Sequence, residues 1–431
     1  MNILKLTICL FLSLHLLASP AFSKTFEIML QGFHFNSHRV DKGWYNIINE
    51  NSQRIKDSGF TLVWFPPPSD SVSPLGYEPR QLEILDSAYG SKNQLEAAIN
   101  ALRPVRALAD IVINHRSGTK NACEFTKPPW PQHTIVKDDE SCDANLKSIN
   151  NDTGEPANFA RDLDHLNPTV IDGIIAWMNN VLKPVGFVGW RYDFVKGYTG
   201  TVIQEYNDNT IPQFTVGEYF DYNTQEVVNW IDSTHREPLK RATAFDFPLR
   251  NALYQAVAFK NYNFLKFHDI SAGVIGVWSD KAVTFLENHD TEEARNSENA
   301  PPFPGPDEGL LGDQMIQGYA VILTHPGSPC IFWPDIYDSG SRREKQIRDL
   351  IQIRKQYCIH SESKIFIDTA QKDNVYSAYI QGDRGEVAVK IGPGPWNPVG
   401  EKWDPQGDLL MSGNDFAVWG EHGKLEIKPC Q

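Results

Sequence analysis

The sequence predicts a mixed α/β protein whose main part is a closed barrel of eight parallel strands that alternate with helices. Three observations support this fold class. Apolar runs of strand character recur eight times between residues 26 and 333, and segments with helical periodicity lie between most of them. A long polar stretch interrupts the pattern after the third run. After residue 360, short runs in which apolar and polar residues alternate replace the pattern of strands and helices.

The predicted strands are short and rich in β-branched and aromatic residues. They span residues 26–30, 61–65, 105–113, 185–194, 213–216, 243–247, 282–286 and 330–333. The predicted helices have apolar residues at intervals of three and four, and span residues 43–56, 91–102, 169–182, 224–233, 312–324 and 344–356. Strands that alternate with helices form parallel βαβ units, and eight such units predict a (β/α)8 barrel of the TIM type.

Two further parts are expected beside this barrel. Residues 115–165, after the third strand, are too many and too polar for a simple connection, so we expect them to form a small inserted domain. The barrel itself then takes residues 24–114 and 166–360. Residues 361–431 contain five short alternating runs and predict an antiparallel β-sheet domain at the C-terminus.

Residues 1–23 have the pattern of a secretory signal peptide. Lys5 precedes an uncharged run over residues 6–18, and Ala21 and Ser23 are the small residues that a cleavage site needs. No later stretch has the roughly 18 consecutive apolar residues of a membrane-spanning helix. The sequence therefore predicts a secreted protein that has no membrane anchor once the signal peptide is removed.

Charge and cysteine content narrow the class of protein. The formal net charge is -14, which argues against a nucleic-acid partner because phosphate binding needs a basic face. Cys123 and Cys142 flank a Pro-rich polar loop and are candidates for a local disulfide in an oxidising compartment. Cys330, Cys358 and Cys430 remain as an odd set, and the cysteine spacing does not suggest a zinc site.

Acids and histidines gather where four of the predicted strands end. The segments are Asp110 to His115, Gly189 to Asp193, Gly217-Glu218 and Asn288-His289-Asp290. In a (β/α)8 barrel the carboxyl ends of the strands meet at one face, which carries the active site. One such acid alone would be typical of a solvated loop or a helix cap, but four segments together indicate a site.

These residue types suit glycoside hydrolysis. One carboxylic acid can protonate the leaving oxygen, a second carboxylate can attack the sugar or direct water, and Arg and His side chains can bind hydroxyl groups. A metal-dependent hydrolase is the alternative, with Asp110, His115, His289 and Asp290 as ligands. We disfavour it because Arg191, two residues before Asp193, would repel a catalytic dication.

In this order, the four segments resemble the signature regions of the α-amylases of glycoside hydrolase family 13. The similarity to the plant-type enzymes continues through residues 63–69, Gly76-Tyr77, residues 162–167 and the turn at residues 325–329. It covers residues 26–419, almost the whole mature chain. The family resemblance implies a secreted endo-acting hydrolase of α-1,4 bonds in starch-type or glycogen-type glucans, with a retaining mechanism.

The resemblance also implies a role for each site residue. Asp193 would be the nucleophile, Glu218 the general acid/base, and Asp290 the carboxylate that binds ring hydroxyls. Arg191 would hold Asp193 ionised, and an apolar setting near Tyr219 and Phe220 would raise the pKa of Glu218. The implied substrate-binding residues are Tyr77, His115, Arg191, Lys196 and His289. Tyr77 as a core aromatic and Lys196 as a solvated side chain are the simpler alternatives.

A structural calcium ion, Ca2+, between the barrel and the inserted domain is a further implication of the resemblance. The matching oxygen ligands are the Asn114 side chain, the Asp162 carboxylate, the Gly197 carbonyl and Asp152. The spacing between Asp152 and Asp162 does not follow the plant pattern, and Asp162 as an ordinary loop acid is the alternative. The sequence departs from the family pattern at two more places, Tyr219-Phe220 after the acid and a Pro-rich stretch at residues 296–311. Both differences would change the shape of the expected glucan cleft.

Two other functions fit the same fold. One is a catalytically silent carbohydrate-binding relative, and the other is a transglycosylase in which a sugar, rather than water, intercepts the intermediate. The complete set Asp193, Glu218 and Asp290 favours an enzyme. We expect an α-glucan as the only partner and a monomeric protein.

Overall fold

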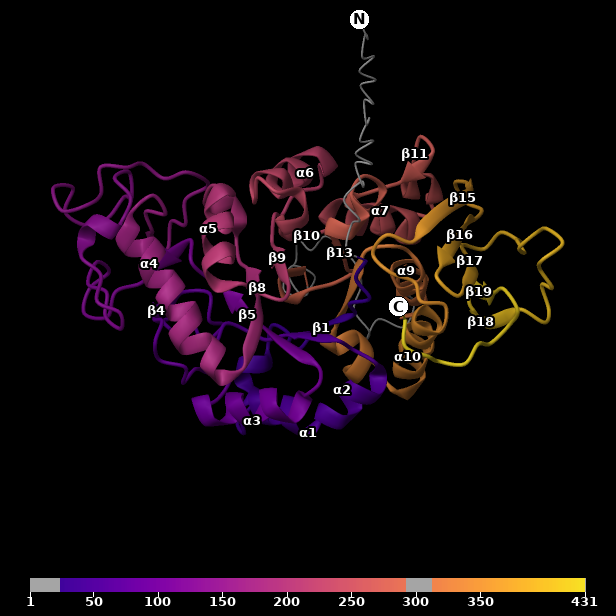
Figure 1. Cartoon of the computed structure of the whole chain (residues 1–431), viewed down its shortest axis with the longest axis horizontal. Helices are drawn as coiled ribbons and strands as arrows, with labels where there is room; N and C mark the ends of the chain where they lie inside the picture. The colour runs from indigo at the N-terminus through magenta and orange to yellow at the C-terminus, as the bar shows by residue number, and fades with distance from the viewer. Residues whose placement is uncertain (1–23, 292–311, 431) are drawn as a thin grey trace, which may run out of the picture.

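The computed structural model describes residues 24–291 and 312–430, shown in Figure 1. The predicted signal peptide, residues 1–23, and the Pro-rich stretch at residues 296–311 lie outside the described residues. Within those two ranges, no helix is both long and apolar enough to cross a membrane.

Eight parallel strands close into a barrel at the centre of the molecule. They are β1 (Met29–Gln31), β2 (Leu62–Trp64), β5 (Arg106–Ile111), β8 (Phe187–Tyr192), β9 (Thr215–Gly217), β10 (Thr243–Phe245), β13 (Ala282–Thr284) and β14 (Ser328–Phe332). Their order around the barrel is β1-β14-β13-β10-β9-β8-β5-β2. Each strand overlaps one of the predicted runs, so the predicted barrel is confirmed.

The helices around the barrel follow the predicted order with several differences. They are α1 (Trp44–Glu50), α2 (Ser52–Ser58), α3 (Lys92–Leu102), α4 (Pro168–Trp177), α5 (Thr201–Thr210), α6 (Thr224–Ser233), α7 (Phe247–Ala258), α9 (Gly312–Thr324) and α10 (Ser341–Gln356). The single helix predicted for residues 43–56 is two helices that meet at Asn51. Helices α5 and α7 were not predicted. Only Asp246 separates β10 from Phe247, the first residue of α7, so the apolar pattern alone did not separate the helix from its strand.

Residues 115–165, between β5 and α4, consist of long loops and a short strand pair. Strand β6 (His115–Arg116) pairs with β7 (Arg161–Asp162), and the predicted Cys123–Cys142 disulfide is present. The buried guanidinium carbon of Arg116 lies 4.9 Å from the centre of the Phe125 ring and 4.8 Å from that of Trp130. This stretch lies on the opposite side of the barrel from the C-terminal sheet (Figure 1). The exact domain boundaries, 114/115, 165/166 and 360/361, stay predictions.

The C-terminal part is an antiparallel sheet of five strands. They are β15 (Lys364–Ala370), β16 (Tyr376–Gly382), β17 (Gly385–Ile391), β18 (Leu409–Gly413) and β19 (Phe416–Gly420), in the order β15-β16-β17-β19-β18. A second disulfide joins Cys358, just after α10, to Cys430. Sequence spacing did not reveal this pair, and it leaves Cys330 as a buried thiol on β14.

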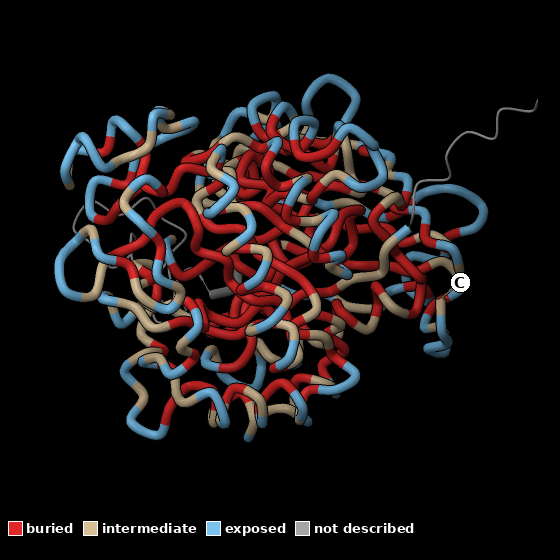
Figure 2. Tube along the Cα trace, turned by 60° about the vertical axis from the view of Figure 1, so that its left-hand side comes forward, coloured by how far each residue is buried: buried red, intermediate tan, exposed pale blue. Residues whose placement is uncertain are grey.

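One buried arginine joins α10 to the turn between α9 and β14. Arg354 on α10 donates to the carbonyl oxygens of His325 at 2.7 Å and Gly327 at 2.6 Å, at the turn between α9 and β14. It also donates to the Leu323 carbonyl oxygen at 3.3 Å. Figure 2 shows that the buried residues form a continuous interior, with exposed residues mainly in the outer loops.

We expect Arg354→Leu to destabilise the protein by about 3 kcal/mol or more, because three buried carbonyl groups would lose their donor. Thermal or urea unfolding of the variant measures the loss. Arg348→Leu, on the exposed part of the same helix, is the matched control and should change the free energy of unfolding by less than about 0.5 kcal/mol. Equal stability of the two variants would contradict this role for Arg354.

Candidate active site

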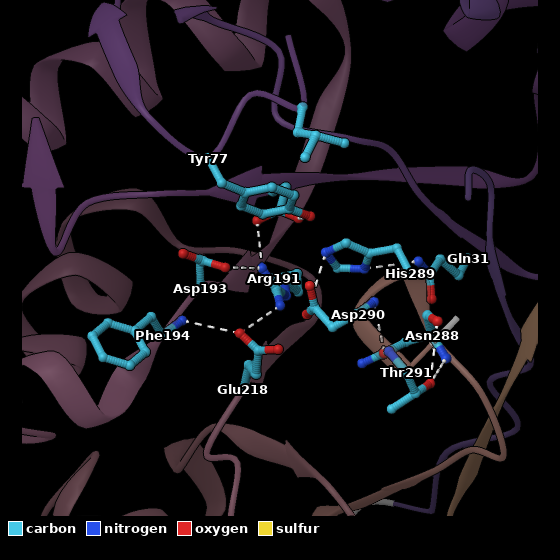
Figure 3. Close-up of polar contacts among 12 residues, drawn as sticks. Gln31, Tyr77, Arg191, Asp193, Phe194, Glu218, Asn288, His289, Asp290 and Thr291 are labelled. Carbon is cyan, nitrogen blue, oxygen red and sulfur yellow. Dashed lines mark hydrogen bonds and ion pairs between the residues drawn. The ribbon is translucent and has the colours of Figure 1, made fainter. Parts of the chain in front are cut away.

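The strand-end residues predicted from the sequence meet in one cleft at the mouth of the barrel. Asp193 follows β8, Glu218 follows β9, and His289 and Asp290 lie beyond β13. The cleft has a volume of about 670 Å³, and its lining includes Tyr77, His115, Asp193, Lys196, Glu218, His289 and Asp290. The structure therefore brings together residues separated by more than 200 positions in the sequence, as Figure 3 shows for five of them.

Arg191 lies at the centre of this cluster. Its side chain is completely buried, and its Nη1 atom donates to Asp110 Oδ1 at 2.8 Å and to Asp193 Oδ1 at 2.5 Å. Its Nη2 atom lies 2.7 Å from Glu218 Oε2. One guanidinium therefore holds the predicted nucleophile and the predicted acid in a fixed relation to each other (Figure 3).

Two local features of the backbone hold these carboxylates in position. Phe194 has a left-handed conformation with φ 42°, which is unusual for a residue with a bulky side chain, and its N–H donates to Glu218 Oε2 at 3.2 Å. Gly217, the last residue of β9, packs so closely on Trp230 of α6 that a Cβ atom there would lie 2.0 Å from the ring. Close approach of α6 to β9 therefore requires glycine immediately before Glu218.

The environment of Glu218 favours its protonated form at neutral pH. Burial raises the pKa of Glu218 to about 8, and the negative charges of Asp193 and Asp290 also raise it, while Arg191 lowers it. The predicted rise in the pKa of Glu218 is thus confirmed, but the surroundings of Glu218 differ from the expected apolar ones. Phe220 is half exposed to the cleft, and Tyr219 lies over Lys196 with Nζ at 5.1 Å from the ring centre.

The expectation that Arg191 alone keeps Asp193 ionised needs correction. Burial raises the pKa of Asp193 to about 7 although Arg191 lowers it, and the charge of Asp110 adds to the rise. The guanidinium carries one positive charge and faces three carboxyl groups, so it offsets only part of the energetic cost of burying them in ionised form. Burial and the neighbouring acids therefore raise the pKa of Asp193 and that of Glu218 together.

Asp110 supports the site from beneath, whereas the sequence analysis gave it a role only as a ligand in the metal-dependent alternative. Its Oδ2 atom accepts hydrogen bonds from Tyr77 Oη at 2.8 Å and Trp64 Nε1 at 3.0 Å. The Tyr77 ring stacks on His289 with a centre distance of 4.9 Å and an angle of 11°. Tyr77 is therefore fixed at both its hydroxyl group and one face. The position of Asp110 at the end of the third predicted strand was the signal that could have identified it.

Both predicted site histidines are neutral hydrogen-bonding groups. Burial lowers the pKa of His115 and that of His289 to about 4. His289 Nδ1 lies 3.1 Å from Gln31 Nε2, and its Nε2 atom lies 3.5 Å from Asp290 Oδ2. His115 Nε2 lies 2.8 Å from the Tyr77 carbonyl oxygen. Gln31, at the end of β1, is a second supporting residue that the sequence pattern did not reveal.

The rim of the cleft carries charged and aromatic side chains. Lys196 lines the cleft, and its Nζ atom donates to Asp221 Oδ2 at 2.9 Å, so it is an ion-paired rather than a simply solvated lysine. Phe159, Phe220 and Tyr222 also line the cleft, with 62%, 51% and 46% of their surface exposed. Exposed aromatic rings that share one concave surface are typical of a binding site and offer apolar faces to a ligand.

The geometry does not support the metal-dependent hydrolase considered from the sequence. Both carboxylate oxygens of Asp110 already accept hydrogen bonds from Arg191, Tyr77 and Trp64. In the two described ranges, no three His, Cys, Asp or Glu side chains gather as a metal site would require. Asp110, His115, His289 and Asp290 therefore do not form a ligand set for a catalytic ion.

The predicted calcium ligands do come together where the inserted stretch meets β8. Asn114 Nδ2 donates to Asp162 Oδ1 at 3.2 Å, and the Glu155 N–H donates to the Lys196 carbonyl oxygen at 2.9 Å. A Cβ atom on Gly197 would lie 2.1 Å from Asn114 Oδ1. The two turns that carry Asp152 and Gly197 are therefore packed against each other beside Asn114 and Asp162.

The chemistry of this pocket fits a hard cation. Asp152 Oδ2 is buried and has no hydrogen-bond partner in the part of the chain that the structure describes. Burial, with the charges of Asp152 and Asp139, raises the pKa of Asp162 to about 7. A cation would compensate both carboxylates, and their oxygen atoms are the ligand type that Ca2+ prefers. The Ala157 N–H donates to Asp162 Oδ1 at 3.0 Å and helps to hold this carboxylate in place.

Comparison with known proteins identifies the family. A protein of Arabidopsis thaliana named probable alpha-amylase 2 is 36% identical over 91% of this chain and 94% of its own length. The chain belongs to the α-amylase family. Chloroplastic alpha-amylase 3 of the same plant is 33% identical over 91% of this chain and 44% of its own length. Residues 356–420 match the family model described as the alpha-amylase C-terminal beta-sheet domain.

A solved structure supports the α-amylase fold independently. The α-amylase of Geobacillus thermoleovorans, solved with acarbose, superposes with a TM-score of 0.63 over 85% of this chain and 86% of its own, at 16% identity. At that identity the likeness concerns the fold alone. The resemblance predicted from the four strand-end segments is therefore confirmed at the level of both family and fold.

The raised pKa of Glu218 predicts a specific dependence of stability on pH. The folded state holds a proton on Glu218 up to about pH 8, whereas an unfolded chain releases it near the ordinary value of 4.5, so the free energy of unfolding falls as pH rises between these values. We expect Glu218→Gln to reduce the loss of stability between pH 5 and pH 8 by at least about 1 kcal/mol.

Chemical denaturation of both proteins at several pH values measures this difference. Glu226→Gln, an exposed position on α6, is the control and should leave the pH dependence unchanged. A variant at Glu218 that loses stability with pH as steeply as the unmodified protein would contradict the assigned protonation.

Proposed function

We propose that this α-amylase cleaves internal α-1,4 bonds of starch-type and glycogen-type glucans by a retaining double displacement. The observation that carries the proposal is the contact of Asp193 and Glu218 with the same buried guanidinium in one cleft. A shared guanidinium favours a short separation of the two carboxyl groups. Retaining enzymes have roughly 5 to 5.5 Å between them, whereas inverting enzymes need room for a water molecule.

In the first step, Glu218 donates its proton to the glycosidic oxygen while an oxygen of Asp193 attacks the anomeric carbon. The bond to the leaving sugar breaks, and a covalent glycosyl ester forms on Asp193. The raised pKa of Glu218 supports its role as the acid, because a group with a pKa of about 8 holds its proton at neutral pH. Loss of the proton leaves Glu218 negative and strengthens its contact with Arg191.

In the second step, Glu218 acts as a base. It takes a proton from a water molecule that attacks the anomeric carbon, the ester bond to Asp193 breaks, and the product keeps its original configuration. Asp290 binds ring hydroxyl groups, and its exposed position at the cleft supports contact with substrate. His115 and His289, both neutral, exchange hydrogen bonds with sugar hydroxyl groups, Tyr77 offers its ring, and Lys196 reaches a neighbouring sugar.

A bound Ca2+ would supply positive charge and rigidity at the junction of the inserted stretch and the barrel. We propose Asn114, Asp152, Asp162 and the Gly197 carbonyl as the residues that hold it, on the strength of the buried, unpaired oxygen of Asp152 among the described residues. Asn114 directly precedes His115, so order in this pocket favours a fixed position of His115 in the cleft. We also propose that the chain is exported by the signal peptide at residues 1–23 and works as a monomer.

We expect Glu218→Gln and Asp193→Asn each to lower kcat on soluble starch by at least about 100-fold, because each removes a group that acts in the transition state. Reducing-sugar release measures the rate, and proton NMR of early product tests retention by detecting the α-anomer first. Glu226→Gln is again the control. An inverted first product, or a Glu218→Gln variant with an unchanged rate, would contradict the mechanism.

We expect a calcium chelator to lower the Tm of the unmodified protein by several degrees, since an ion that binds only the folded state stabilises it. Asp152→Asn and Asp162→Asn should lower the Tm without chelator and abolish the further drop with it. Asp143→Asn, an exposed acid of the same stretch, should retain the full response. A chelator response that survives in the Asp162→Asn variant would place the ion elsewhere.

A further inference from the structure

A second hollow lies beside the active-site cleft, at a hairpin that follows α7. Strands β11 (Lys266–Phe267) and β12 (Ile270–Ser271) pair in antiparallel register and stand out from the molecule next to α7 (Figure 1). The hollow has a volume of about 380 Å³ and lies between this hairpin, α7 and the start of α6. None of the predicted catalytic or calcium residues lines it.

The polar lining of the hollow consists mainly of neutral amides. Asn251, Asn261 and Asn263 contribute side chains to it, and Lys266 is the one charged residue that lines it within the described ranges. Lys266 faces Asp269 at 3.6 Å, so its charge is partly offset. A nucleotide or an acidic peptide would need several unpaired cations, whereas amide groups suit an uncharged ligand with many hydroxyl groups.

One of these amides has an unused acceptor. The Oδ1 atom of Asn261 is buried and has no hydrogen-bond partner among the residues that the structure describes. Such an atom costs about 1 to 3 kcal/mol unless a donor reaches it from outside the chain. Its accessible surface is almost zero, so a hydroxyl group in the hollow reaches it only when the Asn261 side chain turns toward the hollow.

Exposed aromatic rings form the rim of the hollow. Phe264 and Phe267 have 47% and 64% of their surface exposed, and Tyr222 has 46%. Large apolar side chains that are exposed as a group mark interaction sites. Rings beside neutral amides match the two chemistries of a sugar, namely its apolar C–H face and its hydroxyl groups.

Tyr222 joins the hollow to the active-site cleft, since it lines both. Its ring centre lies 5.6 Å from that of Phe220, which belongs to the cleft. We propose that the hollow binds the continuation of the α-glucan chain whose reacting part occupies the cleft. This inference rests on the proposed function, and it makes the hairpin at residues 266–271 a determinant of the preference for long chains.

The test compares a long substrate with a short one. In the Phe264→Ala/Phe267→Ala variant, we expect KM for long-chain amylose to rise about five- to tenfold, the size expected from the loss of two ring contacts. A chromogenic maltotrioside, short enough to occupy the cleft alone, should be cleaved with unchanged kcat/KM. Phe259→Ala, an exposed ring at the end of α7 outside the hollow, is the matched control and should behave as the unmodified protein on both substrates.

Two kinetic results would overturn the proposal: no change on amylose, or an equal loss on amylose and maltotrioside. Affinity electrophoresis in amylose gels gives an independent measurement of binding. If the unmodified protein cleaves neither substrate, the proposed function fails, and the gels still decide the inference. Retardation that is weakened in the double variant but not in Phe259→Ala would support the hollow as a glucan site, and equal retardation of all three proteins would overturn it.

Discussion

The active site depends on the contacts of one buried positive charge, the guanidinium of Arg191. It contacts Asp110, Asp193 and Glu218 together, and the Trp64 ring lies 4.8 Å from its Cζ atom. Burial of one cation with three acids is costly unless geometry and hydrogen bonds are nearly complete. Strands β5, β8 and β9 provide that geometry because they are neighbours in the closed barrel, and their carboxyl ends meet at the same face.

The incomplete compensation by this charge is also what makes the site reactive. If each carboxyl group had its own cation, all would ionise at ordinary pH and no acid would remain. With one cation among three, burial raises the pKa of both Asp193 and Glu218. Supporting contacts from Trp64, Tyr77 and Gln31 then hold the cluster without adding charge. The protonation of the two carboxyl groups therefore follows from their shared environment.

Several separate segments of the chain form the surroundings of the cleft. The stretch between β5 and β8 contributes Phe159 and the calcium-type pocket, while the loop after β9 contributes Phe220, Tyr222 and Asp221. The hairpin after α7 extends this surface further. Loops on a rigid barrel can vary without loss of the central charge cluster, so the rim can change independently of the strand ends.

Local sequence patterns were enough to predict the barrel, the C-terminal sheet, the Cys123–Cys142 disulfide and the acids and histidines that meet in the cleft. Those predictions depended on local information: apolar runs of strand length, helical periodicity, and acids at strand ends, which the topology of a parallel barrel must bring to one face. The same local signals failed where two elements merge in one apolar run, as β10 and α7 do, and where a partner is distant, as Cys430 is from Cys358.

The mutual influence of the site residues, by contrast, depends on distances that arise only when the chain is folded. The sequence places Arg191 two residues from Asp193 and correctly indicates a contact, but it does not show that Asp110 and Glu218 share the same guanidinium. The pKa of Asp193 therefore rises instead of falling, because a shift depends on burial and on every charge within a few ångströms. Likewise, the hollow at the hairpin exists only because α6, α7 and β11 pack side by side, and sequence order does not encode that distance.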